Sequence, residues 1–249
     1  MYEENKMEEK KTKKKSFLLS RNVLKWMAYF FLFLYCYSRI VIQNGQMHIE
    51  SINSSVLSEM MSQNTSFMAL ANKAVVFEFL GYLAIPMFAF LLADGYKYTS
   101  DFKKYFLRCL ILALTCEPLY DFATHGSWIS FTSQNPVFSL CIALLLLKGL
   151  DTIQAKKWMY PILLVAAILW AILLKTSFGL GIVLLSGVYW IFRNKRYLQL
   201  LAGCAISSIF YTAPLASLLL CLSKGKEENF NGSFFYAIYP LILIVCIIL

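Results

Sequence analysis

Long apolar segments alternate with short polar connections along almost the whole chain. Each apolar segment is long enough, or nearly so, for a helix across a hydrocarbon core about 30 Å thick, which takes about 20 residues. The segments lie at roughly 23–42, 72–96, 105–123, 137–150, 158–174, 178–193, 197–222 and 233–249. This pattern predicts an all-α fold, a polytopic membrane helix bundle of about eight transmembrane helices. The short connections after the second segment predict antiparallel neighbours.

The charged residues of the connections show a consistent sidedness. Every second connection is rich in Lys and Arg, and the basic ones lie near 97–104, 148–157 and 193–196. Because basic connections stay in the cytoplasm, this alternation predicts that both chain ends are cytoplasmic (N-in/C-in). Residues 1–21 then form a cytoplasmic basic tail and residues 22–249 a single transmembrane domain. The predicted location is the plasma membrane, here a bacterial cytoplasmic membrane.

Composition agrees with a membrane protein and excludes other classes. Hydrophobic residues make up 59% and charged residues 15% of the chain, against about 45–50% and roughly 25% in soluble domains. The net charge of +9 comes from short loops, so it orients helices and forms no groove for nucleic acid. The lipid bilayer is the expected partner. The seven cysteines and two histidines show no metal-ligand spacing, so no metal site is predicted.

Ionisable residues inside apolar segments are costly in a bilayer and are therefore candidates for a functional site. An outer group is predicted near the outer helix ends: Arg39, Glu78, Glu117, Asp121, Gln134 and Asn135. Glu117 and Asp121 are four residues apart and share one helix face. An inner group consists of Asp94, Lys104 and Arg108, for which an Asp94–Arg108 pair is plausible. The alternative is that these charges only fix helix packing or reach the interface.

Several motifs carry a resemblance to a known family. The segment GYLAIPMFAFLLADGYKYT at 81–99, followed by Tyr105 and Arg108, resembles the TraX family. Similar segments follow in the family's order: EPLYD at 117–121, QNPVFSL at 134–140 and FYAIYP at 235–240. The resemblance covers nearly the whole chain and is densest over residues 80–140.

The resemblance implies a membrane-embedded acyltransferase. The family is named for the protein that acetylates the N-terminal amine of conjugative pilin, so acetyl-CoA is the implied donor and a peptide or small molecule the implied acceptor. On the matching positions, the implied catalytic candidates are Glu117 and Asp121. The implied cofactor-binding candidates are Arg108, Lys104 and Asp94. The substrate or structural polar cluster comprises Arg39, Glu78, Gln134 and Asn135.

The chain also departs from the family pattern. Tyr35 and Cys36 stand where members carry an Asp-His pair, Tyr82 replaces the Arg of a Gly-Arg step, and Ile242 stands in place of a C-terminal His. With no histidine in a predicted helix, proton transfer would fall to a carboxylate, Glu117, Asp121, Glu78 or Asp94. Three hypotheses follow: an acetyltransferase, a catalytically inactive TraX-like accessory protein, and a small-molecule or ion transporter.

Overall fold

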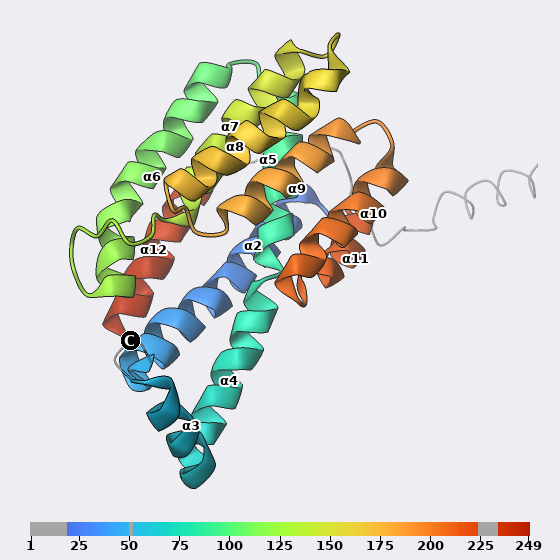
Figure 1. Cartoon of the computed structure of the whole chain (residues 1–249). Helices are drawn as coiled ribbons and strands as arrows, with labels where there is room; N and C mark the ends of the chain where they lie inside the picture. Colours follow the sequence, from blue (N-terminus) through green and yellow to red (C-terminus); the bar gives the residue numbers. More distant parts are fainter. Residues whose placement is uncertain (1–18, 50–51, 224–233) are drawn as a thin grey trace, which may run out of the picture.

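The computed structural model describes residues 19–49, 52–223 and 234–249 and is drawn in Figure 1. All regular elements in these ranges are helical, which confirms the predicted all-α class. The elements are α2 (Arg21–Cys36), its π-helical continuation η1 (Tyr37–Gln46), α3 (Ser54–Gln63), α4 (Thr65–Gly81), α5 (Ala84–Tyr98), α6 (Phe102–His125), α7 (Pro136–Thr152), η3 (Lys157–Met159), α8 (Tyr160–Leu173), α9 (Gly179–Ile191), α10 (Arg196–Ser207), η4 (Ser208–Phe210), η5 (Ala213–Leu215), α11 (Ala216–Cys221) and α12 (Phe234–Ile248).

Two helical stretches are long and apolar enough to cross a membrane, judged by length and composition. They are Arg21–Gln46, which joins α2 and η1, and Thr65–Tyr98, which joins α4 and α5. Shorter apolar helices of 10–17 residues are Lys157–Leu173, Gly179–Ile191, Arg196–Phe210 and Phe235–Ile248. The predicted number of about eight spans is therefore not confirmed by helix length.

Local sequence signals fix several helix ends. The Asp101 side chain caps α6 by accepting the backbone N–H of Lys104 at 3.1 Å. Gly126 ends α6 in the left-handed conformation, at a φ of 67°. Pro86 has no N–H to donate to the carbonyl one turn earlier, so the predicted second segment breaks at Tyr82, between α4 and α5.

The helices run between two ends of the bundle. One end, called the basic end here, holds Arg21 at the start of α2, and there Tyr96 donates to Asp151 at 3.2 Å. The opposite end, called the far end, holds Gln46 at the end of η1. There the backbone N–H of Gln134 donates to the Lys175 carbonyl at 3.1 Å.

The predicted seventh segment, 197–222, is not one helix. It divides into α10 and the η5–α11 unit, and the chain reverses between them. Thr212 donates to the Phe79 carbonyl near the middle of the bundle, whereas Ser223 returns beside Arg196 at the basic end. Two features beyond α10 and η4 prevent one continuous helix: Tyr211 adopts a φ of 46°, and Pro214 cannot donate a helical hydrogen bond.

This reversal overturns the prediction that both chain ends lie on one side. α12 begins at the basic end, where the Tyr29 hydroxyl donates to the Phe235 carbonyl at 2.7 Å. It ends at the far end, where Leu249 and Gln46 line one cavity, and Figure 1 marks the C-terminus there. The described chain therefore starts at the basic end and finishes at the far end. Lys224 and Lys226 lie outside the described residues.

Close packing of α2 against α4 determines how these helices are arranged in the half of the bundle nearer the far end. A Cβ atom added to Gly81 would lie 2.5 Å from the Tyr35 Cβ and 2.8 Å from the Tyr35 Cα. Only glycine allows backbones to approach this closely. The contact places Tyr35 beside Tyr82, with ring centroids 6.0 Å apart.

Candidate functional site

A polar network joins η1 to α4 towards the far end. Gln43 lies at its centre: its amide nitrogen donates to Glu78 at 2.7 Å and to Ser38 at 3.1 Å, and its oxygen accepts from Arg39 at 2.9 Å. Tyr82 donates to the second oxygen of Glu78 at 2.6 Å. The structure thus brings the predicted Arg39 and Glu78 together through Gln43. Ser38 and Gln43 share a face because η1 is π-helical, with five residues per hydrogen-bonded step.

A second group lies between α6 and α7. Glu117 accepts two hydrogen bonds at one oxygen, from the Asn135 side-chain amide at 2.5 Å and from the Asn135 backbone N–H at 3.1 Å. Asn135 is fully buried, donates also to the Ala113 carbonyl at 2.8 Å, and caps α7 by accepting from Val137 at 2.9 Å. The other oxygen of Glu117 is buried without a hydrogen-bond partner among the described residues.

The remaining two outer candidates have different surroundings. Asp121 is buried and accepts the backbone N–H of Ser130 at 2.7 Å, so it holds the loop between α6 and α7. The backbone of Gln134 pairs with that of Lys175 and with that of Ser177, whose N–H donates at 2.9 Å. Asp121 and Gln134 therefore both form contacts with loops.

Three tyrosines lie between these groups, and sequence analysis gave none of them a role in the site. Tyr120 is 2.6 Å from Ser177, hydroxyl to hydroxyl, and Tyr35 lies within electrostatic reach of Arg39 and Tyr120. Tyr239 is 3% exposed, and its hydroxyl has no hydrogen-bond partner among the described residues. Tyr239 also lies within electrostatic reach of Glu117. The available signal was the family pattern, because Tyr35 and Tyr239 both fall in its motif regions.

The basic end contains a cavity of about 540 Å³. Its lining includes four cationic residues from α2 and α6: Arg21, Lys25, Lys104 and Arg108. Both predicted cations, Lys104 and Arg108, are therefore in one cavity. Asp101 also lines it; its pKa is lowered, chiefly by the hydrogen bond from the Lys104 backbone and also by the Lys104 side chain at 3.3 Å.

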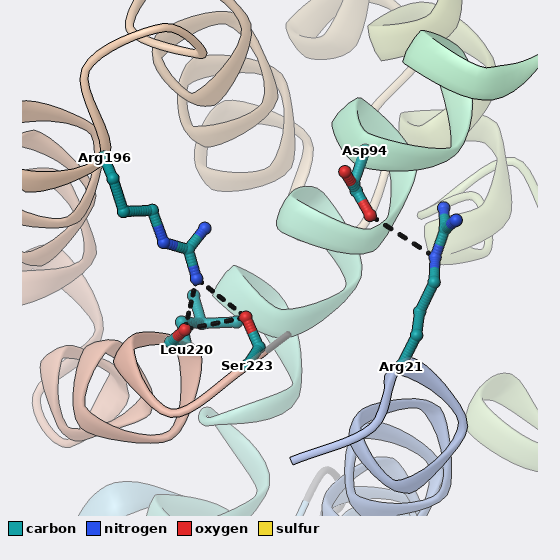
Figure 2. Close-up of polar contacts among 5 residues, drawn as sticks. All are labelled: Arg21, Asp94, Arg196, Leu220 and Ser223. Carbon is teal, nitrogen blue, oxygen red and sulfur yellow. Dashed lines mark hydrogen bonds and ion pairs between the residues drawn. The ribbon is translucent and has the colours of Figure 1, made fainter. Parts of the chain in front are cut away.

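The predicted Asp94–Arg108 pair is wrong, because Asp94 pairs with Arg21. The Asp94 carboxylate lies 3.4 Å from the Arg21 guanidinium, as Figure 2 shows. The start of α2 packs beside the end of α5. These two segments are far apart in the sequence, so the charges of a single connection do not predict their contact. Arg196, on the other side of Asp94 in Figure 2, donates to the Leu220 carbonyl and to Ser223.

An apolar chamber of about 70 Å³ continues the basic cavity into the bundle. The two spaces share five lining residues: Tyr29, Phe88, Leu112, Val137 and Leu140. The wall of the chamber includes Tyr35 and Tyr239. Pro136 lines the chamber as well and is next in sequence to Asn135, which donates to Glu117. The arrangement is a cationic cavity joined to an apolar chamber with two tyrosines in its wall.

Comparison with known proteins gives one match. The TraX protein family matches residues 20–249, which is nearly the whole chain. Neither the curated proteins nor the solved structures contain a match. The family match confirms the resemblance seen in the motifs at 81–99 and 117–121. The chain therefore belongs to the TraX family.

Proposed function

We propose that the chain is a multi-pass protein of the cytoplasmic membrane with its basic end in the cytoplasm. Large apolar side chains are exposed in rows on the outer helices, which is rare on a water-soluble monomer. They include Leu107, Ile111 and Leu114 on α6, Ile162, Leu169 and Trp170 on α8, and Leu241, Val245 and Ile248 on α12. Lipid chains would cover these rows, and the cations at the basic end favour the cytoplasmic side.

We further propose that the protein is an acyltransferase that uses acyl-CoA, with acetyl-CoA as the expected donor and an amine or hydroxyl as the acceptor. One observation carries this proposal: the cationic cavity shares lining residues with an apolar chamber whose wall includes Tyr239 and Pro136. Tyr239 and Glu117, which accepts hydrogen bonds from the Pro136 neighbour Asn135, each have a buried polar atom without a hydrogen-bond partner among the described residues. Such atoms are costly unless a ligand satisfies them.

The residues of these two spaces fit the chemistry of CoA. Its phosphates would meet Arg21, Lys25 and Arg108, whose guanidinium and ammonium groups bind phosphate through charge-assisted hydrogen bonds. A cavity of about 540 Å³ is in the usual range for ligand sites. Leu112 and Leu140 would line the narrow passage for the extended arm. When bound, the thioester supplies an acyl carbon whose bond to sulfur breaks on transfer.

Glu117 and Tyr239 would supply the two groups that such a transfer needs. Glu117 would take the proton that the acceptor amine or hydroxyl loses; its oxygen without another partner among the described residues supports this role. Asn135 holds the other oxygen and so orients the carboxylate. The Tyr239 hydroxyl would donate to the acyl carbonyl oxygen, where negative charge grows during attack. The released sulfur takes up a proton, so the net proton count is unchanged.

The test is CoA release from acetyl-CoA by the purified protein in lipid nanodiscs, with a membrane extract as the source of acceptor. Glu117→Gln removes the base and should slow release by about 100-fold or more. Tyr239→Phe should slow it by on the order of 100-fold, because it removes one donor to the carbonyl. Asp121→Asn is the matched control: it retains a side-chain oxygen for the Ser130 bond and should change the rate little.

Equal rates in the wild type and Glu117→Gln would refute the site assignment. A wild type that neither binds CoA nor releases it from acetyl-CoA with any acceptor would instead favour the inactive accessory protein. That outcome would also explain the loss of the family's Asp-His pair at Tyr35 and Cys36 and of its C-terminal histidine at Ile242.

A further inference from the structure

We infer that the loop at 126–133, called the aromatic loop here, inserts into the outer interfacial layer of the lipid bilayer. The loop connects α6 to α7 and folds back beside the far end of α6 (Figure 1). Three large apolar side chains are highly exposed on it: Trp128 (61%), Ile129 (75%) and Phe131 (81%). The loop has no charged residue. The inference rests on the membrane embedding proposed above and does not depend on acyl transfer.

The aromatic loop continues the exposed apolar face of α6. Leu107, Ile111, Leu114 and Pro118 follow one another at spacings of four, three and four residues, so they form one stripe along the helix. Phe122 extends the stripe by one more turn. The Trp128 ring stacks on Phe122, with centroids 4.6 Å apart and planes at 23°. The surface that faces lipid along α6 therefore passes directly onto the loop.

The depth of the loop agrees with the bilayer interface. Phe122 follows Lys104 by 18 residues in α6, which is about 27 Å of helix at about 1.5 Å per residue. The hydrocarbon core is about 30 Å thick. If Lys104 lies at the cytoplasmic interface, the Trp128 ring on Phe122 lies at the outer one. Tryptophan is enriched at this level because its ring is amphipathic.

Internal hydrogen bonds hold the aromatic loop in this position. Asp121 accepts the Ser130 N–H at 2.7 Å, in the middle of the loop. Ser130 in turn donates to Thr132 at 3.0 Å and accepts the Thr132 N–H at 3.2 Å. The polar atoms of the loop thus bond within the loop and to α6, and the apolar side chains point outwards. Asp121 is accordingly a positioning residue, and the interfacial anchor it supports fixes the height of Glu117, one turn earlier on α6.

The experiment measures fluorescence quenching in phosphatidylcholine–phosphatidylglycerol vesicles made with brominated lipids. One lipid carries bromine close to the headgroup, and another carries it close to the bilayer centre. The signal of Trp128 is the fluorescence lost in Trp128→Phe. We expect this component to lose more intensity with the headgroup-proximal bromine. Trp170, 60% exposed on α8, is the matched control, and the component lost in Trp170→Phe should be quenched more by the central bromine.

Three results would overturn the inference. A Trp128 component quenched by aqueous iodide and by neither lipid would place the loop in water. A component shielded from iodide and from both lipids would mean that protein, such as a second copy, covers the loop. If the Trp170 component is also unquenched by lipid, the membrane embedding itself fails. Asp121→Ala should shift the Trp128 pattern towards iodide, whereas Asp121→Asn should leave it unchanged.

Discussion

Replacing Asn135 by Ala should cause one of the largest losses of stability among single polar substitutions. The side chain makes three hydrogen bonds that Ala cannot make: the α7 cap, the bond to Glu117 and the bond to the Ala113 carbonyl. Loss of an N-cap costs about 1 kcal/mol. Side-chain hydrogen bonds between membrane helices average about 0.6 kcal/mol and reach about 1.7 kcal/mol. The bond to a carboxylate belongs near the upper value, so the total is about 3 kcal/mol.

Reversible unfolding by SDS in mixed micelles, followed by tryptophan fluorescence, measures this free energy. Asn135→Ser is the matched variant, because serine restores the cap but cannot reach Glu117 with an amide. It should recover about 1 kcal/mol of the loss. Glu117→Gln in both backgrounds completes a double-mutant cycle. The reasoning is refuted if Asn135→Ala unfolds with the wild-type free energy, or if Asn135→Ser is no more stable than Asn135→Ala.

Three further predictions test other parts of the structure. Gly81→Ala should lower the free energy of unfolding by about 1–3 kcal/mol, because the added Cβ meets the Tyr35 backbone. Gly149→Ala is the control: its added Cβ meets only the end of the Leu163 side chain, at 3.1 Å, so it should lower the free energy of unfolding less in the same SDS titration. Arg108→Ala should weaken CoA binding on the order of ten-fold, about 1.4 kcal/mol, by titration calorimetry at low salt, while the exposed Lys195→Ala should not. The hydrogen bond from the Lys104 backbone N–H is the main cause of the lowered pKa of Asp101. The Asp101 cap therefore stabilises the protein fully above about pH 4, and this stabilisation is lost as the pH falls further. Asp101→Asn, which keeps the cap, should flatten this part of the melting-temperature profile, and an unchanged profile would contradict the assignment.

The sequence predicted the helical class and the positions of most helices, because apolar length and helix caps are local properties. It did not predict where the chain reverses within 197–222. Hydropathy depends on composition and carries no information on the direction in which the chain runs. The apolar residues continue through the turn at Tyr211 and Pro214, so the turn cannot be seen in the hydropathy pattern.

The polar residues of the candidate site within or next to apolar segments were mostly predicted, whereas its tyrosines and Gln43 were missed. Arg39, Glu78 and Glu117 were found because polar residues inside apolar segments are costly, and Asn135 was found because it opens the fourth segment on the same side. Gln43 was missed because it lies just beyond the end of the first apolar segment. Tyrosines such as Tyr239 are common in membrane helices as packing residues, so only the structure reveals that the Tyr239 hydroxyl has no hydrogen-bond partner among the described residues.

The most direct test of the central claim is the transfer of radiolabelled acetyl from acetyl-CoA in sealed membrane vesicles of known orientation. Inside-out vesicles present the basic end to added acetyl-CoA, and right-side-out vesicles hide it. We expect label transfer to membrane or luminal acceptors in inside-out vesicles with the wild type, and little or none with Glu117→Gln. Equal transfer by both proteins, or transfer only in right-side-out vesicles, would contradict it.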